Sequence, residues 1–466
     1  MPNITTIPFL LMFAVVWRMT GGQVLAVVAF VSVFSAASVL DFGPMGVAPW
    51  LFALALGLGI RLFQGHKPYR VTLGTNRKAL CMALVFFVYA AWSGVAYPLM
   101  FAGTPVVRTV AEEPLSWSTS NFSQLCYLGS AAVLYLLALA ASRQELRNIL
   151  NWYVRGCILA SAIAMYQLLN AITRIPYPSE ILYSNKAHVV YSAYQINGIW
   201  RLNATFCEAS EMAGFLIVGI ALTGWSLVTE PFKLTRLLSL LLMLTSILMT
   251  VSSVGYLCLG YLTVCGAILA IGYVVRQRQL SIPKVVFGLL VAIGVCGLFS
   301  LQPGARETVT KVIRSTLLEK QNSESYRNRT LTHDAALQTM RNTYFMGAGW
   351  GSARASGLVY ILLATAGVPG LLLFIALLVS LLTPLFDSNP PKKQRPLADQ
   401  FGQALLALSV LLLAMVIAGS EPVDPLLWIL LGVVTVARSP IAKTAPAASK
   451  SSLSLANDTT VARTHA

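Results

Sequence analysis

A succession of long apolar segments constrains this chain more than any other feature of its sequence. Most of them contain about 17–25 residues, the length that an α-helix needs to cross a membrane. Full spans are expected at residues 22–40, 47–62, 82–101, 122–141, 149–170, 209–229, 237–253, 255–275, 285–301, 357–385, 401–419 and 425–437. With 56% hydrophobic and only 11% charged residues, the composition lies outside the range of soluble globular proteins. The sequence therefore predicts an all-α, polytopic integral membrane protein with about twelve transmembrane helices.

The first residues fit this pattern only in part. Residues 4–17 are apolar but shorter than a full span, so they are expected to form either an interfacial segment or the first half of a broken helix. The opening sequence MPNITTIPFL carries no positively charged side chain, so we expect no cleaved signal peptide.

Basic residues between the apolar segments predict the orientation of the chain. Five connections carry them, at residues 61–78, 143–147, 233–236, 276–284 and 392–395. With about twelve spans, all five fall on one side of the membrane, together with Arg18 and the tail that follows Arg438. The positive-inside rule makes this side cytoplasmic, so both termini are expected in the cytoplasm. These loops explain most of the net charge of +16, and we expect no nucleic-acid partner.

The other long connections then form an extracytoplasmic face. Residues 1–301 are expected to hold membrane helices with an extracytoplasmic loop at 171–207. A long extracytoplasmic loop with an amphipathic helix follows at 302–356, and C-terminal membrane helices follow at 357–438. Residues 439–466 are rich in Ala, Ser, Thr and Lys without an apolar period, which predicts a disordered cytoplasmic tail.

The polar stretch from residue 302 to residue 356 is the first candidate site. Its charged groups cannot face lipid, because each unpaired one costs several kcal/mol there. Its basic residues are Arg306, Lys311, Arg314, Lys320, Arg327, Arg329, Arg341 and Arg354. Such a surface suits an anionic ligand, and attraction to lipid headgroups also explains it. Apolar residues recur between residues 325 and 340 as in an amphipathic helix on a membrane surface, where we expect His333 to be structural.

A second candidate site is the stretch RLNATFCEASEMAGFL, residues 201–216. Glu208 and Glu211 are three residues apart, so they share one face at the start of a helix. Two interpretations stay open for them. They are first-turn acids that complement the helix dipole, or one is a general base beside a phosphate-binding Arg201. Glu211 lies deeper in the apolar segment and is costly to bury without a purpose.

Two weaker patterns concern glycine and serine. The run from Gly347 to Gly351 predicts a flexible turn whose backbone N–H groups can face an anion, although it matches no nucleotide-binding fingerprint. Small polar residues at 252–255 predict a tight helical hairpin or close packing of helices. The sequence has no Asp-x-Asp, no HExxH and no Cys/His cluster, so neither a metal nor a cofactor is expected.

Three stretches together resemble one family. Residues 201–216 look like the signature that opens a membrane helix in bacterial polysaccharide polymerases. The sequence TVSSVGYLCLGYL, residues 250–262, resembles the Ser-rich break found two helices later. Residues 325–374 resemble the long periplasmic loop and next helix of the O-antigen ligase and polymerase superfamily, with its Gly-x-Gly turn and a helix motif that here reads Ala366-Gly-Val-Pro-Gly370.

The resemblance implies a metal-independent, C-type membrane glycosyltransferase of the bacterial inner membrane. Such an enzyme moves a glycan from an undecaprenyl-diphosphate carrier to an acceptor at the periplasmic face, in exopolysaccharide or O-antigen biosynthesis. By position, Arg201 is expected to contact the diphosphate and Glu208 to position or activate the acceptor. The implied substrate-binding residues are Glu211, Arg327, Arg329, Arg341 and Arg354. Expected partners are the lipid-linked oligosaccharide, membrane lipids and other polysaccharide assembly and export proteins.

The chain also departs from the family pattern. Ligases carry a His after the Gly-rich turn and an Arg beside the Ser-rich break, whereas residues 352–356 lack the His and residues 252–254 lack the Arg. The polymerase signature usually has Pro where this chain has Ala209. The missing His and Arg argue against a ligase to lipid A and leave polymerase-like activity or a non-catalytic relative open. Two alternatives stay open: a transporter or flippase of lipid-linked sugars, and a non-enzymatic subunit of a polysaccharide export machine.

Overall fold

The fold is that of a computed structural model, which describes residues 21–42, 45–64, 76–107, 112–186, 190, 194–196, 199–277, 324–382, 395–419 and 421–437. The structure is mostly helical, with 75% helix and few strands. Among the described residues, five helices are long and apolar enough to cross a membrane, within Arg77–Met100, Thr119–Ala140, Arg143–Thr173, Ala209–Thr229 and Gln400–Ala418. Further apolar helices are shorter. Together these helices indicate an all-α membrane protein.

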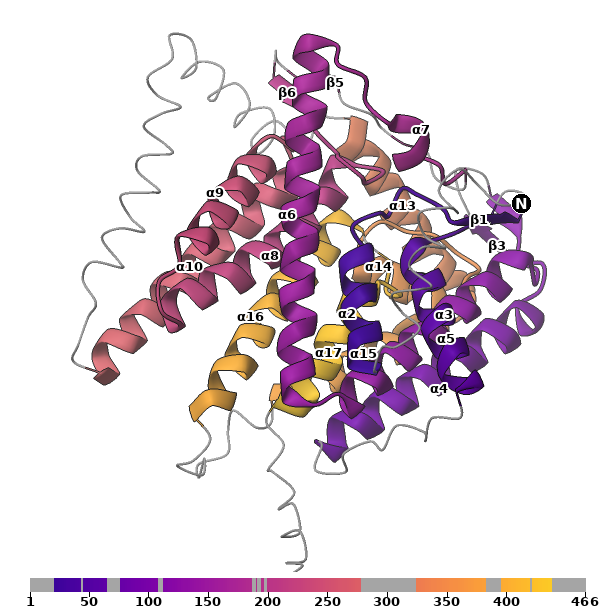
Figure 1. Ribbon diagram of the computed structural model, residues 1–466. Helices are drawn as coiled ribbons and strands as arrows, with labels where there is room; N and C mark the ends of the chain where they lie inside the picture. The colour runs from indigo at the N-terminus through magenta and orange to yellow at the C-terminus, as the bar shows by residue number, and fades with distance from the viewer. Residues whose placement is uncertain are drawn as a thin grey trace, which may run out of the picture.

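Figure 1 labels the elements along the chain. The helices are α2 (Gly21–Val31), α3 (Pro49–Phe63), α4 (Arg77–Met100), α5 (Thr119–Ala140), α6 (Arg143–Thr173), α7 (Ser179–Leu182), α8 (Ala209–Thr229), α9 (Leu234–Leu248), α10 (Ser253–Gln277), α13 (Glu324–Asn342), α14 (Leu358–Thr365), α15 (Gly367–Leu382), α16 (Arg395–Ala418) and α17 (Pro425–Ala437). The long helix α6 runs through the middle of the view, with α9 and α10 on one side and α3, α4 and α5 on the other (Figure 1).

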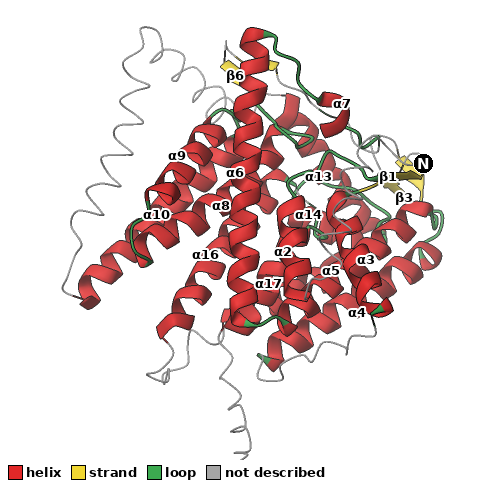
Figure 2. Cartoon of the chain, in the orientation of Figure 1, coloured by secondary structure: helices red, strands yellow, loops and turns green. Residues whose placement is uncertain are grey.

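The strands form three short antiparallel hairpins in the loops, as Figure 2 shows. They pair β1 (Leu40–Phe42) with β2 (Met45–Val47), β3 (Pro105–Val107) with β4 (Glu112–Pro114), and β5 (Tyr194–Ile196) with β6 (Ile199–Arg201). The last pair matters for function, because Arg201 ends β6 and pairs across the hairpin with Tyr194.

An aromatic cluster holds the centre of the helical bundle together. The fully buried indole of Trp428 on α17 lies with its ring centroid 4.3 Å from that of Phe87 and 5.8 Å from that of Phe86, both on α4. Its Nε1 donates a 2.7 Å hydrogen bond to the carbonyl oxygen of Pro422. Burying such large rings is among the strongest contributions that side chains make to a core.

The helices depart most from the predicted spans in two places. The segment predicted at 22–40 is helical only to Val31, because the following residues turn away to bond with the loop before α8: Thr205 Oγ1 donates to the carbonyl oxygen of Val33. The segment predicted at 357–385 is two helices, α14 and α15. They separate at Gly367, whose φ of +67° is a left-handed conformation that glycine adopts without strain.

Other predictions have mixed outcomes. The tight hairpin is confirmed, because α9 ends at Leu248 and α10 begins at Ser253. Twelve full spans are not seen: the described helices include five of full-span length. The predicted span at 285–301, the N-terminal segment at 4–17 and the tail at 439–466 lie outside the described residues.

The helix predicted between residues 325 and 340 is present as α13. Its inner face carries Ala336, Thr339 and Met340, which are buried against α14 and β3. Leu331 is 63% exposed and lies outside this contact. The helix therefore packs on the protein itself and brings its polar residues to the end of the bundle where α8 begins and α16 ends.

Candidate functional site

Arg329 of the polar stretch lies within electrostatic reach of the two predicted catalytic residues. Burial lowers the pKa of Arg329, the negative charge of Glu208 raises it, and the positive charge of Arg201 lowers it. The three residues come from α13, from the position just before α8, and from the end of β6. We call Arg201, Glu208 and Arg329 the charged cluster.

Glu208 holds the carboxylate of the charged cluster. It is the N-cap residue of α8, with an extended backbone (φ −131°, ψ 151°), but its side chain does not cap the helix. Instead, its Oε2 accepts a 2.8 Å hydrogen bond from the hydroxyl of Ser210. The side chain is half-buried. A carboxylate that is held by one hydroxyl and still reached by solvent is suited to accept a proton from a bound ligand.

Glu211 has a structural explanation. It occupies the third position of α8, and its carboxylate accepts hydrogen bonds from the backbone N–H groups of Cys207 and Glu208. This is the acceptor half of a capping box, which satisfies donors that the helix leaves unpaired at its start. The helix cap accounts for an acid at this position. A role for Glu211 towards a substrate stays a prediction.

Both arginines of the charged cluster also bind backbone carbonyl groups. Arg201 Nε donates a 3.2 Å hydrogen bond to the oxygen of Thr250, in the turn between α9 and α10. Arg329 Nη1 donates a 2.6 Å hydrogen bond to the oxygen of Ile417, next to the last residue of α16. A cation is favourable at a helix C-terminus, because unpaired carbonyl oxygens collect there. These bonds hold each guanidinium in place at the end of the bundle.

A buried polar network supports the loop that leads to Glu208. Gln167 of α6 donates 2.8 Å from Nε2 to Asn203 Oδ1, and its Oε1 accepts from the backbone N–H groups of Asn203 and Ala204. The hydroxyls of Tyr177 and Tyr183 donate to the carbonyl oxygen of Ala204. The network fixes residues 203–204 between Arg201 and Glu208. A glutamine inside an apolar segment is the sequence signal for this network. We did not predict the network from the sequence.

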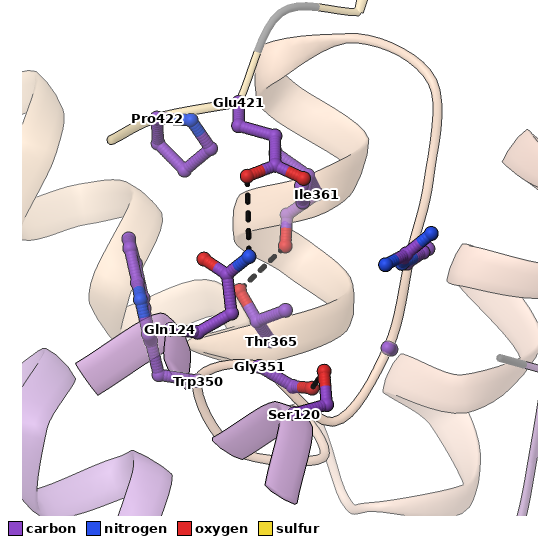
Figure 3. A pocket seen from close by; sticks show the side chains of 10 residues that line it. Ser120, Gln124, Trp350, Gly351, Ile361, Thr365, Glu421 and Pro422 are labelled. Atoms are coloured by element: carbon purple, nitrogen blue, oxygen red, sulfur yellow. Dashed lines mark hydrogen bonds between the residues drawn. The ribbon is translucent and has the colours of Figure 1, made fainter. Parts of the chain in front are cut away.

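A cavity lies at the Gly-rich turn. It is formed by the start of α5, the Gly-rich turn, α14 and the loop before α17, and it encloses about 360 Å³ counting space open to solvent. Figure 3 shows Gln124 and Glu421 facing one another across it, joined by a 3.2 Å hydrogen bond from Gln124 Nε2 to Glu421 Oε2. The charge of Glu421 also acts on Glu211. Among the described residues, no member of the charged cluster lines this cavity.

The predicted basic residues divide into two groups. Arg354 lines the cavity, and Arg329 belongs to the charged cluster. Arg327 and Arg341 are exposed on α13, and among the described residues no hydrogen bond or ion pair joins either of them to the cluster. Glu421 and Gln124 line the cavity but were not identified from the sequence, where single polar residues near helix ends carry little signal.

The Gly-rich turn is packed against the bundle, contrary to the flexible anion-binding turn that we predicted. The N–H groups of Ala348 and Gly349 donate 2.8 Å hydrogen bonds to the oxygens of Ala364 and Thr365. The N–H of Gly347 donates to the hydroxyl of Thr343. A Cβ at Gly349 would lie 2.7 Å from the backbone oxygen of Ser93. These backbone groups are occupied, so the glycines serve close packing.

His333 joins α13 to α14. Its ring stacks on that of Tyr360, with centroids 3.8 Å apart and planes at 8°. Burial lowers the pKa of His333, a hydrogen bond with the backbone of Ser356 and the charge of Asp334 raise it, and the charge of Arg329 lowers it. The stacked geometry fits the structural role predicted for this histidine.

No protein-family model matches the sequence, and no curated protein matches it. The chemistry of the site therefore rests on its own residues. Among the described residues, no group of three or more His, Cys, Asp and Glu side chains could hold a metal ion. The charged cluster holds a second cation and one carboxylate within electrostatic reach of Arg329. This arrangement can bind a phosphate-bearing ligand and accept a proton beside it.

Proposed function

We propose that this protein is a polymerase-like membrane glycosyltransferase that joins lipid-linked glycan units at the periplasmic face of a bacterial inner membrane. In this proposal the chain crosses the membrane about twelve times. Its basic loops and both termini lie in the cytoplasm, as the positive-inside rule favours. The product is an exopolysaccharide or O-antigen chain, and ligase activity is the less favoured variant.

The charged cluster is the observation that supports the proposal. Arg329 belongs to the polar stretch, whereas Arg201 and Glu208 belong to the segment before α8. Residues that resemble the polymerase signature and residues that resemble its long loop thus lie within electrostatic reach of one another.

The proposed reaction displaces the lipid diphosphate at the anomeric carbon of the donor sugar. An acceptor hydroxyl oxygen forms the new bond to that carbon while the bond from the carbon to the diphosphate oxygen breaks. Glu208 takes the proton that leaves the hydroxyl. Arg201 and Arg329 stabilise the charge that grows on the departing diphosphate, where preorganised cations contribute most.

A non-enzymatic role is the second candidate. The hydrogen bonds from Arg201 and Arg329 to the oxygens of Thr250 and Ile417 are favourable without any substrate. In a non-enzymatic subunit of a polysaccharide export machine, the arginines need only form these structural hydrogen bonds. This alternative predicts normal polymer when each arginine is replaced by a neutral residue that preserves the fold.

The test is an assay of the purified full chain with an undecaprenyl-diphosphate-linked oligosaccharide, with product length resolved on a gel. The proposal predicts a ladder of products that grows with time. A folded protein that yields no ladder with several carriers would contradict it. A transporter is distinguished in a deletion strain, because it predicts lipid-linked substrate on the cytoplasmic side instead of single repeats outside.

A further inference from the structure

A second, larger cavity lies between α6, α8, α9 and α16, away from the charged cluster. It encloses about 930 Å³ counting space open to solvent. Helix α8 begins just after Glu208, and its residues Thr223 and Ser226 line this cavity. At 1.5 Å per residue, about 20 Å of helix separates the two sites. The cavity is therefore a distinct site towards the other end of the bundle.

The lining of this cavity is basic. Arg155, Lys233 and Arg236 line it, and no Asp or Glu is among its described lining residues. Arg236 forms an ion pair with Glu230. Among the described residues, neither Arg155 nor Lys233 pairs with a carboxylate, and Arg155 lies over the ring of Trp152 at 4.5 Å. Two positive charges at the cavity thus remain without a counter-charge from the described chain.

A buried hydroxyl in the cavity wall has no hydrogen-bond partner. Thr223 is 4% exposed, and its Oγ1 is unpaired among the described residues. A buried polar group that is left unpaired costs free energy, so such groups in native proteins usually have a ligand or water to bind. Next to Thr223, Gln403 Nε2 donates to Ser226 Oγ at 3.0 Å and keeps that wall polar. Its oxygen exposes almost no surface, so an acceptor oxygen that enters the cavity binds Thr223 once a neighbouring side chain moves aside.

The surroundings of the cavity are apolar. Leu150, Val154 and Leu222 share its lining with the basic residues. Just outside, Phe232 and Leu234 flank Lys233 and expose 54% and 60% of their surfaces. A ligand that combines an anionic group with hydrocarbon chains matches this pattern. A soluble anion would contact only the polar part of the cavity lining. Basic pockets between membrane helices bind lipid headgroups elsewhere for the same reason.

We propose that this cavity binds the phosphate-bearing headgroup of an anionic membrane lipid. Arg155 and Lys233 contact the phosphate, Thr223 donates to one of its oxygens, and the acyl chains lie along the apolar surface of α9. The proposal is independent of the reaction at the charged cluster.

The experiment is native mass spectrometry of the purified full chain, released from micelles that contain phosphatidylglycerol, phosphatidylcholine or inorganic phosphate alone. We expect retained phosphatidylglycerol and weak retention of phosphatidylcholine. Replacing Arg155 and Lys233 by Gln should raise the dissociation constant roughly fivefold for each charge removed. Thr223→Val keeps the shape of the wall and removes the unpaired hydroxyl. It should weaken binding by roughly tenfold while the protein stays folded.

The matched control is Arg147→Gln, because Arg147 is an exposed cation on the same end of α6 that does not line the cavity. It should leave phosphatidylglycerol binding unchanged. Equal losses in Arg147→Gln and in the double variant would mean diffuse surface attraction and would overturn the site. Unchanged binding in Thr223→Val and in the double variant would overturn it as well. Inorganic phosphate that binds as tightly as phosphatidylglycerol would overturn the assignment to a lipid.

Discussion

Gln167 and Asn203 are joined inside the protein by a hydrogen bond of 2.8 Å, from Nε2 of the glutamine to Oδ1 of the asparagine. Both side chains are buried, at 3% and 1% exposure. The glutamine comes from the C-terminal part of α6, and the asparagine lies two residues after Arg201. This bond therefore ties the loop that carries the charged cluster to one of the longest helices of the bundle.

Replacing Gln167 by Leu should destabilise the protein and disturb the charged cluster. The change leaves the backbone N–H groups of Asn203 and Ala204 without partners in a buried place, at a cost of about 1–3 kcal/mol. Thermal unfolding in detergent measures the loss of stability, and the polymer assay measures the loss of activity. Gln144→Leu is the matched control, because Gln144 is exposed on the same helix and bonds only to Asn148 among the described residues. Equal effects of the two changes would contradict the role of the network.

The stack of His333 on Tyr360 predicts a dependence of stability on pH. Because burial lowers the folded-state pKa of His333 below its ordinary value of 6.5, the unfolded chain takes up the proton first as pH falls. The contribution of this group to stability should therefore be full above about pH 6.5 and decrease below it. His333→Phe keeps a stacked ring and removes the titration. The measurement is the difference in unfolding temperature between wild type and variant from pH 5 to 7.5, roughly one unit either side of the ordinary pKa of histidine. This difference should change across that pH range. A constant difference would contradict the prediction.

Asp424 predicts a dependence of stability on pH that is opposite in sign and lies at lower pH. It precedes Pro425 at the start of α17, and its Oδ1 accepts a 2.8 Å hydrogen bond from the N–H of Leu426. Burial raises its pKa from 3.8 to about 6, while hydrogen bonds from Leu426 and Leu427 oppose the rise. The folded protein thus holds the proton more tightly than the unfolded chain, so stability from this group falls as pH rises between these two values.

Asp424→Asn should therefore stabilise the protein at pH 7. The amide oxygen keeps the hydrogen bond to Leu426, and the cost of holding a half-buried charge disappears. We expect a gain of about 1–2 kcal/mol, less than a two-unit shift is worth, because Asp424 keeps some contact with solvent. Denaturant unfolding at pH 7 and at pH 4 measures it: the gain should be present at pH 7 and small at pH 4. An equal gain at both values would contradict the pKa argument.

Gly349→Ala should be strongly destabilising. Gly349 has a φ of +98°, and a Cβ there would lie 2.7 Å from both the backbone oxygen of Ser93 and the Cδ of Pro98. The change both strains the backbone and pushes the Gly-rich turn away from α4, at a cost of about 2 kcal/mol or more. Gly129→Ala on α5 is the control, because a Cβ there meets no atom within 4 Å. It should be neutral or stabilising by up to about 1 kcal/mol. Similar unfolding temperatures for the two variants would refute the packing role.

The sequence predicted the helical architecture well because long apolar segments report directly on membrane helices. It also predicted α13 and the hairpin between α9 and α10, because these two features depend on local periodicity and on small polar residues. It failed at the break between α14 and α15, because the whole of 357–385 is apolar and only the tertiary position of Gly367 separates the two helices.

The candidate site was predictable only in part. Arg201 and Glu208 stand out as charges at the edge of an apolar segment, and the structure places them near Arg329. Their supporting residues do not stand out. Gln167 is one polar residue in an apolar helix, and Glu421 is separated from its partner Gln124 by most of the chain. The Gly-rich turn was misinterpreted because glycine permits both anion binding and close packing, and only the partners of its N–H groups decide between them.

The most direct test of the central claim is the polymer assay with Glu208→Gln. The substitution keeps an oxygen that can accept the hydrogen bond from Ser210, so the fold should be preserved while the proton acceptor is lost. We predict that the rate of ladder formation falls by a factor of about 10²–10⁴. Glu180→Gln, an exposed acid on α7, should leave the rate unchanged. A folded Glu208→Gln protein that builds the wild-type ladder at the wild-type rate would contradict the proposed mechanism.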